Sequence, residues 1–191
     1  PVRQSAGDDK TAAACNEFVC QSTRILFDHA INKKRLKNGL NPANIVLMRG
    51  AGEMGHFEPF SKRYGLSGSV ISAASLINGI GSSVGLSRVS VQGITGSQDS
   101  NIPGKIAAAI EELNTRDFVL VNIKGADESG HDGLAGQKRD FITKTDTALA
   151  PLLDLPQCII VICADHSTPC TIKDHSADPV PVLIHGEGVR V

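Results

Sequence analysis

Residues 117–123 read DFVLVNI, an apolar run of strand length that is followed by a helical segment and by a second apolar run. The second run, CIIVICA, covers residues 158–164 and is the longest apolar stretch in the chain. Between the two runs, residues 137–153 place Phe141 and Leu152 near one stripe, which predicts an amphipathic helix. Strand, helix and strand at this spacing predict a βαβ unit and therefore a parallel sheet.

The same alternation extends outward from this unit in both directions. We expect strands at 45–49, 69–73 and 88–92, an edge or terminal strand between prolines at 180–184, and helices at 11–29, 74–84 and 104–114. A basic, turn-rich connection is expected at 33–44. The predicted fold class is α/β, with a mostly parallel sheet flanked by helices. Ligands of such sheets bind beyond the carboxyl ends of the strands.

Composition restricts the classes of function. The 191 residues carry 19 basic and 20 acidic side chains, so the net charge of −1 gives no basic surface for nucleic acid. No apolar run approaches the roughly 20 residues that span a bilayer, and we expect no membrane partner. Five cysteines without a Cys-x-x-Cys pair favour free thiols in a reducing, cytoplasmic compartment. The oligomeric state is left open, and a homo-oligomer is one alternative.

Three of the six histidines follow predicted strands, each close to a carboxylate. Asp127 and His131 are four residues apart, so one helical turn or a tight loop would aim both inward. Asp165 and His166 directly follow the second apolar run, and His175 comes nine residues later. Carboxylate and imidazole are ligands that Mn²⁺, Zn²⁺ and Co²⁺ share, and five such groups favour two neighbouring metals. The alternatives are a solvated turn for the adjacent pair and a helix-surface pair for the first two residues.

Five motifs, in the same order, resemble one known family. They read NIVLMRGAG at 44–52, GITG at 93–96, KGADESGHDG at 124–133, ADHSTPC at 164–170 and KDHSADPVP at 173–181. With these motifs, nearly the whole chain resembles the cofactor-independent phosphoglycerate mutases of archaeal type, which belong to the alkaline phosphatase superfamily. The resemblance implies a glycolytic isomerase that interconverts 3-phosphoglycerate and 2-phosphoglycerate through a metal-activated phosphoserine. Its partner would be this small phosphorylated substrate.

The resemblance also implies two divalent metal ions, with Mn²⁺, Zn²⁺, Co²⁺ and Mg²⁺ as the alternatives. One metal would take Asp127, His131 and His175. The other would take Asp165 and His166. In the family, the second metal is also bound by an aspartate and by the nucleophilic serine, and both come from an N-terminal segment.

That N-terminal segment has no counterpart in the printed sequence. Ser97 is superficially similar to the nucleophile, but it falls in a different motif of the family. We therefore expect the nucleophile to lie outside this chain. We also expect the chain to be a fragment that lacks both ends of a longer protein and is inactive alone.

The resemblance divides the chain into two parts. Residues 1–52 resemble the end of an inserted substrate-binding domain, and residues 53–191 resemble part of the metal-binding α/β domain. Arg49 matches an arginine that is expected to contact the phosphate or carboxylate of the substrate, and Arg35 is a second candidate. Guanidinium groups suit bidentate recognition of both anions. The alternative for each is a solvated surface arginine.

Two other readings of the function remain open from the sequence. The first is a metal-dependent phosphatase, phosphodiesterase or phosphopentomutase of the same superfamily. The second is a non-catalytic metal-binding domain. Turnover of 3-phosphoglycerate, compared with generic phosphate esters, distinguishes these alternatives from the mutase.

Overall fold

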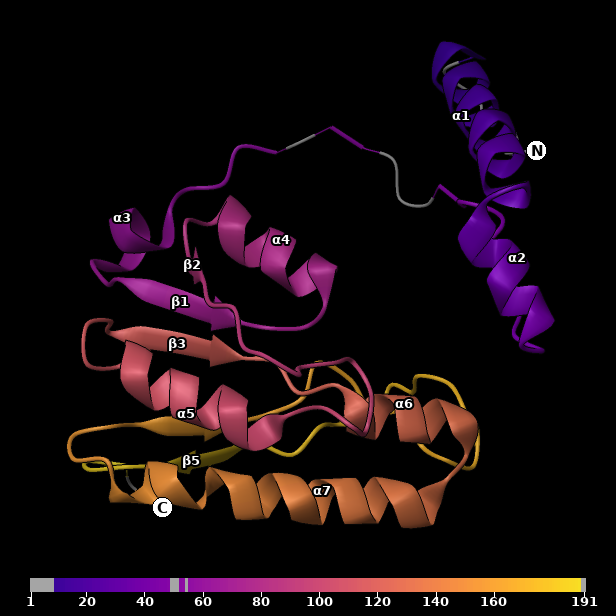
Figure 1. The fold of residues 1–191 in the computed structure, drawn as a ribbon. Coiled ribbons are helices and arrows are strands. Elements are labelled where there is room, and N and C mark those ends of the chain that lie inside the picture. Colours follow the sequence, from indigo (N-terminus) through magenta and orange to yellow (C-terminus); the bar gives the residue numbers. More distant parts are fainter. Residues whose placement is uncertain (1–8, 49–51, 54, 190–191) are drawn as a thin grey trace. The chain divides into compact units, whose positions relative to one another are not determined.

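The computed structural model describes residues 9–48, 52–53 and 55–189 (Figure 1). The chain divides into two compact units, residues 1–55 and residues 56–191. Each unit has its own internal contacts and is described separately. The assignment of the N-terminal part to an inserted domain stays a prediction.

The described residues of the first unit form two helices, α1 (Asp9–Phe27) and α2 (Ala30–Lys37). The periodic segment predicted as a helix forms α1. Helix α2 was not predicted, because its sequence AINKKRLK carries four basic residues and no apolar stripe. A cap starts it instead, since Nδ1 of His29 accepts a hydrogen bond from the Ile31 amide at 3.3 Å.

The side chain of Asn32 joins α2 to the residues before the helix and to the residues after it. Its buried amide nitrogen donates to the carbonyls of Leu26 and Ala43, at 2.8 and 2.9 Å, and its oxygen accepts from the Ala43 amide at 2.9 Å. The strand expected at 45–49 is wrong within the described residues, because 45–48 form no strand and are exposed. The described residues of the first unit form helices and no sheet, so they offer that apolar segment no edge to pair with.

The second unit is built on a three-stranded parallel sheet in the order β2-β1-β3, comprising β1 (Gly68–Ile71), β2 (Ser87–Arg88) and β3 (Phe118–Val121). All four residues of the central strand β1 are buried. Helix α4 (Ser75–Ser83) packs on β1 and β2, and α5 (Ile102–Glu112) packs on β1 and β3 (Figure 1). A short helix, α3 (Phe60–Tyr64), precedes the sheet. The predicted α/β class with a parallel sheet is confirmed.

Only the start of the predicted strand at 88–92 pairs with the sheet. The backbone after β2 stays paired with β1 as far as Val89, whose amide donates to the Val70 carbonyl at 3.0 Å. It then enters a loop that Asn101 closes by donating from its side chain to the Gln92 carbonyl at 3.0 Å. This loop leads to α5, which Asn101 also caps through the Gly104 amide at 2.9 Å.

The second apolar run forms a strand, but the strand does not extend the parallel sheet. In the described part of the chain, β4 (Ile160–Ile162) pairs antiparallel with β5 (Leu183–His185), with Ile160 opposite His185. The single sheet expected from the sequence is therefore a parallel sheet plus a two-stranded ribbon. The terminal strand expected at 180–184 is β5, shifted toward the C-terminus.

Ile102, Ile106 and Phe141 form a core cluster between α5 and α7 (Ala135–Leu149). Leu152 packs against it from a 3-10 turn, η1 (Ala150–Asp154), which completes the helix predicted at 137–153. Phe141 also lies against the start of α6 (Gly125–Asp132), where its ring leaves no room for a side chain on Gly125. The core therefore supports the segment that carries the first predicted metal ligands.

Two further observations concern the cysteines and the hydropathy of the helices. All five cysteines are free. Among the described residues, no helix combines the length and the hydropathy needed to cross a membrane.

Candidate metal centre

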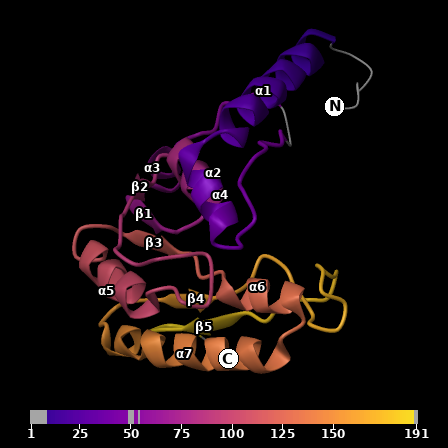
Figure 2. The same ribbon diagram turned by 45° about the vertical axis from the view of Figure 1, so that its right-hand side comes forward.

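Helix α6 begins just beyond the carboxyl end of β3 and presents the first two predicted ligands on one face. Asp127 and His131 are one turn apart, and His131 Nε2 lies 3.4 Å from Asp127 Oδ1. The helix ends at Gly133, which has a φ of 73°, in the left-handed region that glycine adopts without strain. Figure 2 shows α6 next to the C-terminal loops that carry the remaining ligands.

The connection between β4 and β5 brings His166 and His175 to the same place. It folds back on itself at a bridge in which the Ser176 amide donates to the Ser167 carbonyl at 3.0 Å. The two imidazole rings stack with their centroids 3.6 Å apart. His175 Nε2 lies 3.7 Å from Asp127 Oδ1, so residues far apart in the sequence converge on one carboxylate oxygen.

The cluster is continuous and does not separate into two distant sites. His131 Nε2 and His175 Nε2 are 3.2 Å apart, and one ligand atom each from Asp127, His166 and His175 lie within 4.8 Å of one another. Asp165 stands at the rim, with 84% of its side chain exposed and its Oδ2 3.5 Å from His166 Nε2. The structure thus brings together four of the five predicted ligands, with the fifth adjacent to them.

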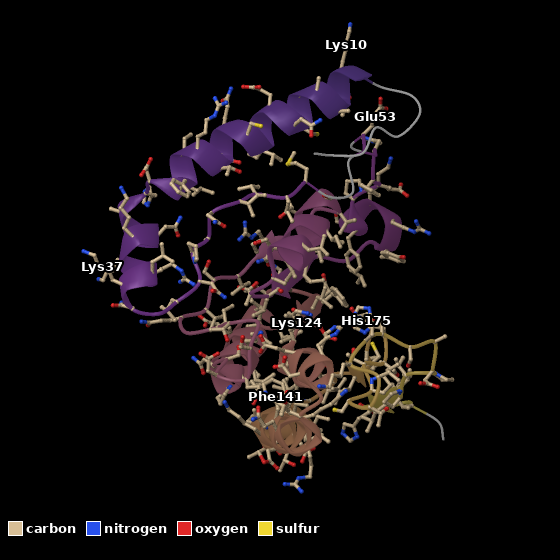
Figure 3. All side chains as sticks on the ribbon, turned by 90° about the vertical axis from the view of Figure 1, so that its right-hand side faces the viewer. Lys10, Lys37, Glu53, Lys124, Phe141 and His175 are labelled. Carbon is tan, nitrogen blue, oxygen red and sulfur yellow. The ribbon has the colours of Figure 1, made fainter. Side chains whose placement is uncertain are left out.

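The two oxygens of Asp127 have different partners. Lys124 Nζ donates to Oδ2 at 2.6 Å, and the Thr168 hydroxyl donates to Oδ1 at 2.6 Å. Burial raises the pKa of Asp127. The hydrogen bonds from Lys124 and Thr168 and the charges of Lys124 and His131 lower this pKa by more, so that it falls to about 2. Figure 3 labels Lys124, at the start of α6, and His175. The centre therefore presents an ionised carboxylate among imidazoles.

This depressed pKa predicts how the stability of the metal-free protein depends on pH. Because the Asp127 pKa is lower in the folded chain, at about 2, than its ordinary value of 3.8, its stabilising contribution is present above pH 3.8. It is lost as the pH falls through about 2, and it amounts to on the order of 2 kcal/mol. We expect urea unfolding in EDTA to show that Asp127→Asn is less stable than wild type at neutral pH, with the difference vanishing in acid. A pH-independent difference would contradict this assignment.

Gly130 lets the loop of Thr168 approach α6 closely. A Cβ at this position would lie 2.9 Å from Thr168 Cγ2 and would collide with the Thr168 carbonyl oxygen. We expect Gly130→Ala to cost roughly 1–3 kcal/mol in chemical denaturation, although alanine favours a helix. Gly136→Ala, in α7 with open space around it, is the matched control and should be neutral or stabilising. Equal effects at both positions would show that the close approach is unimportant.

The structure describes one of the two arginines that were predicted to bind substrate. Arg49 lies outside the described residues. Arg35 lies on α2 in the first unit, where it is exposed and its Nε donates to the Asn41 carbonyl at 2.8 Å. The role of both arginines in binding substrate stays a prediction.

Sequence reasoning missed Thr168 as a partner of the site. Thr168 is buried and contacts both Asp127 and His166. The available signal was its position two residues after His166, within the motif ADHSTPC. Ser167, the neighbouring hydroxyl, instead donates weakly to the Asp178 carbonyl at 3.4 Å. Cys170 Sγ lies 3.9 Å from the Ser129 carbonyl and is not part of the cluster.

Comparisons with known proteins agree with a metal centre. A family model described as the metalloenzyme superfamily matches residues 21–191. The protein of Methanosphaerula palustris named 2,3-bisphosphoglycerate-independent phosphoglycerate mutase is 61% identical over 191 residues, which is 100% of this chain and 46% of that protein. A protein of Archaeoglobus fulgidus with the same name, numbered 1, is 45% identical over 192 residues, covering 100% of this chain and 47% of its own. The chain thus spans just under half the length of these relatives.

Two solved structures share the fold. A protein from Pyrococcus horikoshii superposes with a TM-score of 0.83 at 35% identity, over 95% of this chain and 49% of that one. A cofactor-independent phosphoglycerate mutase from Thermoplasma acidophilum superposes with a TM-score of 0.56 at 28% identity, over 97% of this chain and 44% of the other.

Proposed function

The chain belongs to the metalloenzyme superfamily, and from this premise we propose that it supplies the metal-binding part of a 2,3-bisphosphoglycerate-independent phosphoglycerate mutase. The observation that carries the proposal is the convergence of His131 and His175 on one oxygen of Asp127, at 3.4 and 3.7 Å. The 61% identity to a protein of that name supports the choice of reaction.

The side chains of the cluster fit a divalent cation by their chemistry. Asp127, His131 and His175 offer one carboxylate and two imidazoles, the donor set of Zn²⁺ and Mn²⁺ sites. We assign these three residues to one cation, and we assign Asp165 and His166 to a second. A cation bound there would lower the pKa of a coordinated hydroxyl and would neutralise negative charge on a transferred phosphoryl group.

The other residues of the chain would hold these ligands and the substrate. Lys124 and Thr168 fix the two oxygens of Asp127 in space. Arg49 and Arg35 are proposed to grip the phosphate and carboxylate of the substrate, since a guanidinium binds either group with two parallel hydrogen bonds. These hydrogen bonds would retain glycerate after its phosphoryl group has moved to the serine that we expect outside this chain. Loss of glycerate at that stage would turn the mutase into a phosphatase.

The test of the proposed function is turnover by the protein that contains this chain. We expect conversion of 3-phosphoglycerate to 2-phosphoglycerate without added 2,3-bisphosphoglycerate. Chelator should stop the reaction and divalent metal should restore it. Release of inorganic phosphate from p-nitrophenyl phosphate as the faster reaction would favour a phosphatase. Metal binding without either turnover would favour a non-catalytic domain.

Divalent metal should also stabilise the chain itself. Clustered ligands bind the cation only when folded, so Mn²⁺ at about 100 times its Kd should add about 2.7 kcal/mol to the free energy of unfolding. We expect a rise in melting temperature that EDTA reverses. His175→Ala should remove most of the rise, whereas His185→Ala, on the exposed strand β5, should keep it. A melting temperature unmoved by Mn²⁺ and Zn²⁺ would count against the site.

A further inference from the structure

Thr168 lies between two side chains that reach the cluster from different segments. Its hydroxyl donates to Asp127 Oδ1 at 2.6 Å and lies 3.2 Å from His166 Nδ1. The residue is only 4% exposed, so water does not compete for these contacts. Thr168 therefore bridges a carboxylate on α6 and an imidazole in the loop after β4.

The position of Thr168 is secured on its other sides. Lys138, on α7, donates from Nζ to the Thr168 carbonyl at 2.7 Å. Gly130 of α6 lies against the methyl group and the carbonyl of Thr168, where a larger residue would not fit. Residues of two helices thus contact the backbone carbonyl of Thr168, and one of them also contacts its methyl group. A threonine held in this way can orient its neighbours, because its own rotamer is restricted.

The hydroxyl has a single proton, and this decides the direction of both hydrogen bonds. The carboxylate of Asp127 at neutral pH can only accept, so the proton of Thr168 is committed to Oδ1. The remaining contact then requires Nδ1 of His166 to donate to a lone pair of the hydroxyl. In a neutral imidazole this leaves Nε2, which lies 3.5 Å from Asp165 Oδ2, without a proton and able to bind a cation.

We propose that Thr168 is a positioning residue that holds His166 in its Nδ1-protonated tautomer and orients Oδ1 of Asp127, so that both present lone pairs to divalent metal. The inference rests on the proposed metal centre and adds a residue that positions two of its ligands. Groups behind metal ligands fix tautomer and orientation, and their loss commonly weakens metal binding about 10–100-fold. One hydroxyl would here serve ligands of both proposed cations.

The experiment compares Thr168→Val, which keeps the shape and removes the hydroxyl, with Thr168→Ser, which keeps the hydroxyl. The first readout is the tautomer of His166 in the metal-free chain, from the nitrogen-15 resonances of its ring, assigned by their absence in His166→Asn. We expect the Nδ1-protonated form to dominate in wild type and in Thr168→Ser. Thr168→Val should shift the ring toward the other tautomer. Unchanged resonances in Thr168→Val would overturn the proposal.

The second readout is the Kd for Mn²⁺, measured from the electron paramagnetic resonance signal of free Mn²⁺. We expect about a 10-fold rise for Thr168→Val and a value near wild type for Thr168→Ser. Equal affinities in wild type and Thr168→Val would overturn the positioning role while leaving the metal centre intact. Absence of Mn²⁺ binding in wild type would overturn the metal centre, and the tautomer readout would still decide what Thr168 does to His166.

Discussion

Replacing Asp127 with alanine is expected to abolish most metal binding by this chain. Its Oδ1 atom is the point on which His131 and His175 converge, at 3.4 and 3.7 Å. Loss of a group behind a ligand already weakens binding about 10–100-fold, so loss of the carboxylate itself should raise the Kd for Mn²⁺ by at least about 100-fold. In the protein that contains this chain, the same change should leave almost no mutase turnover.

Asp132→Ala is the matched control for this variant. Asp132 lies at the end of the same helix, is exposed and is not one of the clustered groups. We expect its Kd for Mn²⁺ to stay near the wild-type value, measured by the same titration. Similar Kd values for Asp127→Ala and wild type would show that the cluster is a polar contact between α6 and the C-terminal loops and not a metal site.

The second large effect is expected in the core. Phe141 is 4% exposed and packs on Ile102 and Ile106. Phe141→Ala removes its ring and leaves a cavity, and it should cost about 3–5 kcal/mol. Ile142→Ala, at the neighbouring position of α7 with 52% exposure, should cost far less. Because Phe141 also lies against Gly125, the truncated variant should bind Mn²⁺ more weakly as well.

Tyrosine fluorescence provides a clean measurement of this loss in the second unit. The chain has one tyrosine and no tryptophan. Tyr64 lies on α3, with its ring centroid 4.9 Å from that of Phe60. Urea unfolding followed at this tyrosine therefore reports on the unit that contains the metal centre. Equal unfolding midpoints for the alanine variants of positions 141 and 142 would show that the core cluster does not support the fold.

The main elements of the second unit could be predicted from local pattern. The strand in 117–123 is a continuous apolar run, and the helix in 137–153 turns one apolar stripe toward the core cluster, so both are visible in the sequence. Helix α2 depends instead on a cap and on the side chain of Asn32, which apolar periodicity does not record. The strand expected at 45–49 does not form over its described residues, 45–48, because an apolar run needs a partner edge as well as a suitable composition.

The candidate metal ligands could also be predicted from the sequence, but the residues that hold them in place could not. The four-residue spacing of Asp127 and His131 is a local signal, and it placed both on one turn of α6. His166 and His175 were found from their positions after an apolar run and next to carboxylates, because a loop gives no periodic signal. The roles of Thr168 and Lys138 could not be found in this way, since each depends on a contact with a residue at least 30 positions away.

X-ray absorption at the zinc edge, on the chain loaded with one equivalent of Zn²⁺, identifies the atoms that bind the metal. We expect a first shell of nitrogen and oxygen at about 2.0–2.2 Å, without sulfur. We also expect outer-shell scattering from at least two imidazoles, those of His131 and His175. A sulfur shell at about 2.3 Å would mean that one of the five free cysteines holds the metal, and it would contradict the assignment of the centre to Asp127, His131 and His175.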